Sequence, residues 1–336
     1  MEADGEARSE GAAEAPASST RDRLLKVGRA VFAVALIVLL VLAAADNVKK
    51  LRHVTLQLQP GWALAAIPFT FLGGLALPLA WRHVLFAYGV ALDRATAVRV
   101  WCVSQASRYI PTGVALVASR LVLSSQVGVP RSLAGASLAL ELGLILVWGG
   151  FYVSWLPSYL LPGPLRLLVA LGAVVVLVAL PWLLRVVGRF LPRFPAIAPS
   201  ALRVRHLYEA IGLYGMNDLV RCIGLTLVTA SLHTIDASDL FRVTAAVNLG
   251  FIVGMVGITP AGLGVREGVV AALLAHRFGL GTALALSVAY RAWDFLFELV
   301  WLAIAVTWDR RARRSVEQEC ESSSPAPPVR SEPTSP

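Results

Sequence analysis

The side chains best suited to binding chemistry gather in one stretch, Ile258–Gly268, which lies inside apolar sequence. It reads Ile-Thr-Pro-Ala-Gly-Leu-Gly-Val-Arg-Glu-Gly, a composition that a straight transmembrane helix does not need. Its proline and glycines predict that one helix breaks near Thr259 and that a new helix begins around Val265. Broken backbone persists at membrane depth only where protein buries it or where it lines a wet cavity. The stretch therefore predicts a site.

The new helix could bind an anion, because the first N–H groups of a helix lack backbone partners and carry partial positive charge. Gly262 and Gly264 would let a ligand approach the backbone closely. Arg266 adds a full charge and a planar fork that suits phosphate. We predict that these residues and Glu267 contact substrate. The alternative is that Arg266 pairs with Glu267 or with a neighbouring carboxylate.

Another interrupted segment, 95–126, which comes earlier in the chain, has the same character. Pro111 and Gly113 break it, and Arg108 and Arg120 flank the break. We predict that these four residues are substrate-binding counterparts of the first set. Alternatively, Arg120 lies near the cytoplasmic interface and extends its charged group to water.

Charges also occur within the last apolar segment. Spacings of three and four place Arg291, Asp294 and Glu298 on one helical face. Charges inside a membrane are costly unless they line a cavity or pair with one another. Two interpretations stay open, an internal Arg291–Asp294 bridge, or an acid that carries a proton or neutralises Arg266.

Three further charges complete a predicted cavity network. Glu141 has no local partner, so it either meets an arginine across the bundle or is protonated. Asp218 and Arg221 could pair with each other at a spacing of three. The predicted network consists of Glu141, Asp218, Arg221, Arg291, Asp294 and Glu298.

Composition sets the class of protein. Of 336 residues, 57% are hydrophobic and only 15% are charged, which predicts a polytopic all-α membrane protein. The net charge of +9 could suggest nucleic acid, but the basic residues cluster at the ends of apolar segments, as the positive-inside rule expects. We therefore expect membrane lipids as partners and no nucleic acid.

No catalytic or metal-binding motif is recognisable. The three cysteines are scattered, and the histidines do not pair at metal spacing, so we expect no disulfide framework, metal or cofactor. Neither a Walker loop nor a nucleophile elbow is present, so we do not expect an enzyme. The dispersed histidines are His53, His83, His206, His233 and His276.

Hydropathy predicts about six full transmembrane helices, at 27–45, 62–86, 132–155, 165–184, 208–232 and 282–308. We interpret the interrupted segments 95–126 and 238–278 as re-entrant hairpins. The arm after the first break reaches roughly 20 Å as a helix, whereas the hydrocarbon core is about 30 Å thick. Eight full spans are the alternative. Six and eight spans both leave the two termini on the same side of the membrane, so the pattern of basic residues does not distinguish them.

The two halves, 21–156 and 164–308, share the order span, span, broken hairpin, span. The first hairpin would enter from the cytoplasm and the second from outside, which predicts the inverted repeat of many transporters. Basic residues before the first span and after the last place both termini in the cytoplasm. The basic link 46–59, which this topology puts outside, is the exception. Tails 1–20 and 311–336 are predicted to be disordered around one domain, 21–310.

The broken segments resemble a known family. Its second motif is matched by Pro260–Gly268, then Gly279, Arg291 and Glu298, and its first by Arg108–Gly113 with Arg120. Over about residues 25–310 the chain resembles the lysylphosphatidylglycerol synthase transmembrane region family, a flippase-like membrane protein family.

The resemblance implies a multi-pass protein of the bacterial inner membrane that moves lipids with charged headgroups between leaflets. The aminoacyl-transferase domain of the full-length synthases is absent from this sequence, so we do not expect synthase activity. The leading hypothesis is a translocator of an anionic or charged-headgroup lipid, a phospholipid or a polyprenyl-linked lipid, acting through a polar cavity at the midplane. The alternatives are a membrane-embedded enzyme and an auxiliary subunit partnered with lipid-pathway enzymes. No oligomeric state is predicted.

Overall fold

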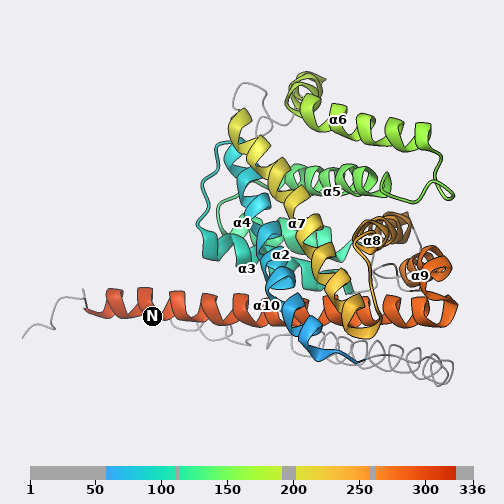
Figure 1. Ribbon diagram of the computed structural model, residues 1–336. Coiled ribbons are helices and arrows are strands. Elements are labelled where there is room, and N and C mark those ends of the chain that lie inside the picture. The colour runs from blue at the N-terminus through green and yellow to red at the C-terminus, as the bar shows by residue number, and fades with distance from the viewer. Residues whose placement is uncertain (1–57, 110–113, 191–201, 257–261, 263, 323–336) are drawn as a thin grey trace, which may run out of the picture. The chain divides into compact units, whose positions relative to one another are not determined.

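A computed structural model describes residues 58–109, 114–190, 202–256, 262 and 264–322 (Figure 1). Every regular element among them is a helix, which confirms the all-α prediction. Four helices are long and apolar enough to cross a membrane, which agrees with the predicted membrane protein. They are α2 (Pro60–Ala87), α5 (Arg131–Val153), α6 (Gly163–Phe190) and α7 (Val204–Leu232).

The other two predicted spans are not among these four helices. The first, 27–45, lies outside the described residues, as does the tail 1–20. The last corresponds to α10 (Leu280–Ser322), which is not among the four apolar helices. The helix also continues through 311–322, which we had assigned to a disordered tail. Arg, Ala, Glu and Gln favour helix there, and the first proline comes only at Pro325.

Both interrupted segments consist of two helices. The first comprises α3 (Arg94–Ala106) with a short 3₁₀ turn at Ser107–Tyr109, followed by α4 (Ala115–Gln126). The second comprises α8 (Asp239–Val256) and α9 (Val265–Phe278). The predicted helix start at Val265 is confirmed, and α4 begins two residues after Gly113. The breaks, 110–113 and 257–261, lie outside the described residues.

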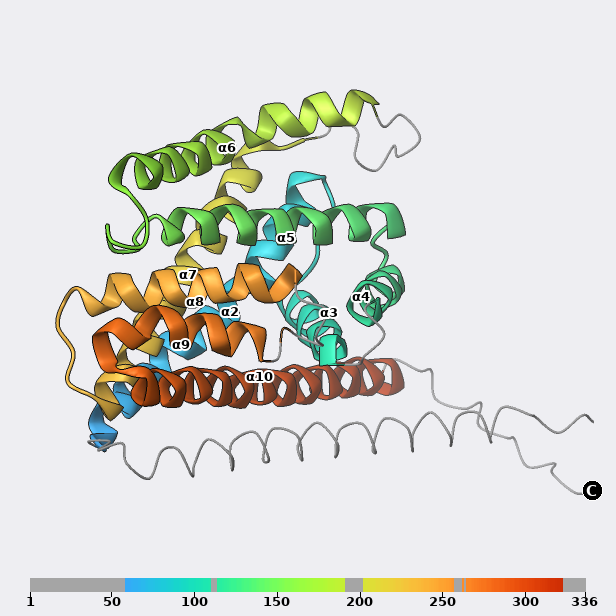
Figure 2. The same ribbon diagram turned by 90° about the vertical axis from the view of Figure 1, so that its right-hand side faces the viewer.

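Four buried apolar clusters of the described residues hold these helices together. One joins α2, α7, α8, α9 and α10, a second joins α2, α5, α6 and α7, a third joins α2, α3, α4 and α5, and a fourth joins α3 and α10. Figure 2 shows α9 between α8 and α10, with which it packs. In the same way α3 packs against α10, and α4 packs against α5. The core therefore brings each interrupted segment against a helix that carries predicted site charges.

Candidate functional site

The second interrupted segment places Arg266 in the first turn of α9, where the side chain is 12% exposed. Its Nη2 lies 2.9 Å from Asp294 Oδ2 on α10. The same oxygen lies 3.2 Å from Nη1 of Arg221 on α7. One carboxylate thus neutralises two arginines from different helices. Of the two acids predicted to counter Arg266, the structure pairs it with Asp294.

Glu267 caps the start of α9. Its Oε2 accepts a hydrogen bond of 2.6 Å from the backbone N–H of Gly264, the reciprocal half of a capping box. Its Oε1 lies 3.8 Å from Nε of Arg291 on α10. The Gly264 N–H is therefore satisfied within the protein, whereas the sequence had suggested that a ligand would meet the unpaired N–H groups of this helix start.

The other charges of this region extend the network to both sides. The buried Asp218 lies one helical turn from Arg221, with 3.9 Å between Oδ1 and Nη2. Arg108, in the 3₁₀ turn of the first interrupted segment, forms an ion pair with Glu298 on α10. The two interrupted segments are therefore connected through α10.

A small cavity lies within the network. Its volume is about 10 Å³, which is close to the space that one water molecule needs. Among the described residues, this cavity is therefore about the size of one water molecule and far smaller than a lipid headgroup. The cavity is lined by Val247, Arg266, Glu267, Val270, Ser287, Tyr290 and Arg291.

The first interrupted segment is arranged differently. Arg120 on α4 is fully buried, and Glu141 on α5 is 1% exposed. Arg120 Nη1 lies 3.2 Å from Glu141 Oε2. Of the two interpretations of Glu141, the structure supports pairing with an arginine across the bundle. It contradicts the interfacial position considered for Arg120, because apolar packing encloses that side chain completely.

Further contacts surround this buried pair, although Nη2 of Arg120 has no hydrogen-bond partner among the described residues. Arg120 Nε donates to Ser104 Oγ over 2.6 Å. Glu141 Oε1 accepts from Trp101 Nε1 over 3.1 Å and from Gln105 Nε2 over 3.3 Å. The guanidinium of Arg120 also lies 4.9 Å from the ring centroid of Trp81 and 5.8 Å from that of Trp101. The pair is sealed by protein, so the structure does not support a ligand contact by Arg120.

The prolines and glycines that were predicted to contact substrate lie in different surroundings. Pro111 and Gly113 lie outside the described residues. Gly262 has φ +69°, and a Cβ there would lie 2.9 Å from the Gly254 carbonyl oxygen of α8. Its small size thus allows backbone packing within the protein instead of close approach by a ligand. Gly264 has φ +83°, and among the described residues no atom lies within 4 Å of the position that a Cβ would take.

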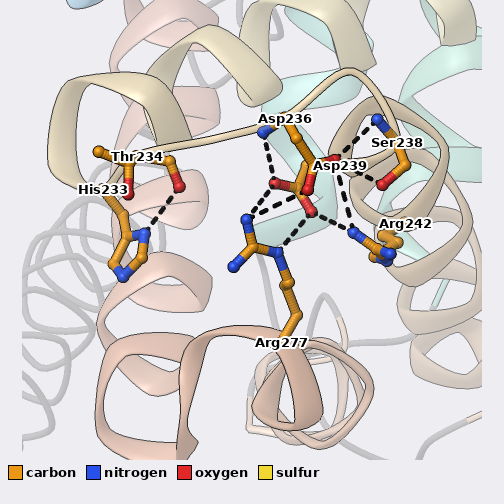
Figure 3. Close-up of polar contacts among 7 residues, drawn as sticks. All are labelled: His233, Thr234, Asp236, Ser238, Asp239, Arg242 and Arg277. Carbon is orange, nitrogen blue, oxygen red and sulfur yellow. Dashed lines mark hydrogen bonds and ion pairs between the residues drawn. The ribbon is translucent and has the colours of Figure 1, made fainter.

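Sequence reasoning missed a charge cluster where α8 begins and α9 ends (Figure 3). Asp239 is fully buried and accepts from Arg242 over 2.7 Å and from Arg277 over 3.2 Å. Asp236 lies 3.3 Å from Arg277, and the Ser238 hydroxyl donates to it over 2.5 Å. That hydrogen bond, followed by the two arginines, holds the pKa of Asp236 below its usual value. The link 233–239, which carries two aspartates and no lysine or arginine, was the available signal.

Sequence reasoning also missed a second group, because its members are far apart in the chain. His83 near the end of α2 faces His206 and Glu209 in the first turns of α7. Both imidazole Nδ1 atoms approach Glu209 Oε2, at 3.0 Å for His83 and 2.8 Å for His206. These are the residues of the described chain whose donor atoms could hold a metal ion.

Comparison with known proteins adds no relative. No family model matches the chain, and no curated protein matches it. The resemblance given above therefore stays a prediction based on the motifs around the two breaks.

Proposed function

We propose that this protein moves an anionic or charged-headgroup lipid, a phospholipid or a polyprenyl-linked lipid, between the leaflets of the bacterial inner membrane. The observation that carries the proposal is the shared carboxylate of Asp294, which bridges Arg266 and Arg221 beside the break before α9. A phosphate offers the same kind of oxygens and could replace this carboxylate between the two guanidinium groups. Ionisable groups inside a membrane are also functional candidates by default.

The proposed architecture has six full spans and two re-entrant segments related as an inverted repeat, with both termini in the cytoplasm. The helix ends on both sides of each break support it. So does the Arg108–Glu298 ion pair, which joins the two breaks through α10. Transport would require α9 and α10 to separate, because the cavity now holds one water at most. Headgroup entry would then exchange the Asp294 contacts for phosphate contacts while the lipid tails stay in the bilayer.

The motif resemblance supports the same function. The matched second motif, Pro260–Gly268, contains Arg266 and its cap, Glu267, and the matched Arg291 and Glu298 belong to α10. Four residues that carry the resemblance, Arg266, Glu267, Arg291 and Glu298, therefore belong to the network of ion pairs around Asp294.

A leaflet-resolved assay tests the proposal. Proteoliposomes would contain fluorescent phosphatidylglycerol or a fluorescent polyprenyl phosphate, and a membrane-impermeant quencher would report the outer leaflet. We expect the wild type to equalise at least one probe, Arg266→Ala to lose most of that activity, and the exposed Arg189→Ala to retain it. Equal rates for the wild type and Arg266→Ala would remove the proposed role of this arginine. Rates no faster than those of protein-free vesicles for both probes would contradict lipid translocation.

One observation favours the alternative of an auxiliary subunit, in which the charges are only structural. Arg266 and Arg221 already share a carboxylate in the closed cavity. The neutral double variant Arg266→Gln with Asp294→Asn separates the two functions, because it removes both charges of the pair while Arg221 keeps Asp218 at 3.9 Å. A subunit in which these charges are only structural should tolerate the neutral pair, whereas a translocator should lose activity because the positive charge leaves the start of α9.

A further inference from the structure

The ends of two long helices bring three donor side chains together, away from the network around Asp294. His83 lies in the last turns of α2, and His206 and Glu209 lie in the first turns of α7. One donor atom from each residue lies within 4.8 Å of the donor atoms of the other two. We propose that His83, His206 and Glu209 bind one divalent transition-metal ion of the zinc class.

The donor set suits such an ion. Two imidazole nitrogens and one carboxylate oxygen are ligands that Zn²⁺ accepts, with a fourth position left for water. Imidazole also suits Ni²⁺, Cu²⁺ and Fe²⁺, whereas Mg²⁺ and Ca²⁺ prefer oxygen ligands. With bonds of about 2.1 Å, tetrahedral zinc holds its ligand atoms roughly 3.4 Å apart. The two nitrogen–oxygen distances, 3.0 Å and 2.8 Å, are shorter than this, so the donor atoms would move apart by about half an ångström to admit the ion.

Neighbouring residues hold the three donors in place. Arg205 Nε donates to Glu209 Oε1 over 3.0 Å, which leaves Oε2 as the oxygen that faces the histidines. The ring of Phe86 packs edge-on against both imidazoles, at centroid distances of 6.0 Å and 5.6 Å. Partners that orient a ligand in this way are a regular part of metal sites.

A hydrogen-bonded cluster without metal is the competing explanation, and one contact speaks against it. His206 Nδ1 forms a hydrogen bond of 2.8 Å with Glu209 Oε2, whereas the buried His83 Nδ1 lies 3.0 Å from the same oxygen without well-aligned hydrogen-bond geometry. A ring nitrogen that faces a carboxylate without a hydrogen bond is suited to direct its lone pair at a shared ion. The three side chains are partly exposed, so an ion can reach them from solvent.

Nearby cations do not block the site. The Arg82 guanidinium stacks on Phe86 at 4.2 Å, and its Nε donates to the Leu92 carbonyl oxygen over 2.6 Å. The Nε–H of Arg82 is thus engaged elsewhere, and the side chain of Arg205 is 88% exposed, so water screens its charge. A bound ion would fasten the end of α2 to the start of α7, the most extensively packed pair of described helices.

Zinc binding to the full chain tests the proposal. The protein would be purified in detergent without a histidine tag, stripped with a chelator and titrated with Zn²⁺ by calorimetry, with bound zinc measured by elemental analysis. We expect about one zinc per chain. His83→Ala and Glu209→Gln should weaken binding by about 100-fold or more, since even loss of an outer partner costs about 10–100-fold. The matched control is His276→Ala, whose ring packs on Tyr159 and does not belong to the cluster.

A second measurement separates loss of the site from loss of the fold. Zinc should raise the thermal unfolding temperature of the wild type and of His276→Ala, because it binds the folded state preferentially. It should leave that of His83→Ala unchanged, even where the variant unfolds cooperatively by itself. Equal zinc content and equal thermal shifts in the wild type and His83→Ala would overturn the proposal, as would a wild type that binds no zinc. Neither result depends on lipid transport.

Discussion

The two interrupted segments place similar residues in different surroundings. After the first break, Arg120 is fully buried against Glu141, and it donates a further hydrogen bond to Ser104. After the second break, Arg266 and Asp294 are each 12% exposed, and their partners belong to a longer chain of ion pairs beside a small cavity. A break followed by an arginine therefore does not define a binding site by itself. The packing around the arginine decides whether its partner can be exchanged.

The largest expected effect concerns the sealed pair. Glu141→Gln leaves the buried charge of Arg120 without its carboxylate, and breaking a buried ion pair typically costs about 3–5 kcal/mol. We expect a loss of this size in the free energy of unfolding, measured by denaturant titration in detergent. Glutamine preserves the shape of the side chain, so the change isolates the charge. A loss below that of the corresponding change at Asp294 would contradict the contrast between the two segments.

That corresponding change is Asp294→Asn. Because the pair with Arg266 is partly exposed, we expect a smaller loss of about 1–2 kcal/mol in the free energy of unfolding. Arg266 and Arg221 then lose their shared carboxylate, so the affinity for vesicles that contain phosphatidylglycerol should rise, about tenfold for each 1.4 kcal/mol gained. The same variant with Arg266→Ala is the control and should lose the gain. Unchanged affinity would show that these arginines do not receive anions.

The glycines before α9 offer a finer comparison within the second segment. Gly262→Ala combines a positive φ with a Cβ placed 2.9 Å from the Gly254 carbonyl oxygen, so we expect it to cost about 2–3 kcal/mol. Gly264→Ala has a positive φ but open space around it, so we expect about 1 kcal/mol. Thermal unfolding of the two variants checks the order. Equal costs would mean that contact with α8 does not constrain the break.

Local signals in the sequence were enough to predict the helices on both sides of each break. Proline and glycine act on the backbone within a few residues, and α9 begins at Val265 as their positions predict. The spacing that put Arg291, Asp294 and Glu298 on one face is a property of the helix itself. Four apolar segments also became helices long enough to span a membrane, because length and apolar composition are local properties.

The choice of partners could not be predicted in the same way. Arg120 and Arg266 have similar sequence neighbourhoods, and only the packing of α3, α4 and α5 around Arg120 makes it inaccessible. The approach of His83 to His206 depends on how α2 lies along α7, which no spacing in the sequence records. Long-range packing therefore determines which predicted charges are enclosed by protein and which have partners that a ligand could replace. It also determines which donor side chains come together although the sequence does not predict their approach.

The smallest expected effect concerns the far end of α9, where the charge cluster around Asp239 fastens it to the start of α8 (Figure 3). The pKa of Asp236 in this cluster is lowered, first by the hydrogen bond from the Ser238 hydroxyl and then by Arg277 and Arg242. Its contribution to stability is therefore complete above the ordinary value of 3.8 and is lost as the pH falls through the lower pKa of the folded state.

We accordingly expect hydrogen exchange at the C-terminal end of α9 to accelerate below about pH 3.8, the ordinary value of this carboxyl group, while the exchange of α4 changes less over the same interval. Exchange measured by mass spectrometry between pH 5 and 3, corrected for the intrinsic dependence of exchange on pH, would show the difference. In Asp236→Asn the acid-induced acceleration at α9 should shrink, because the titrating group is gone. If the variant and the wild type responded identically, the cluster would hold α9 through Asp239 alone. The second segment would then be anchored, like the first, by a buried ionic contact, and the contrast between them would be confined to the surroundings of Arg266.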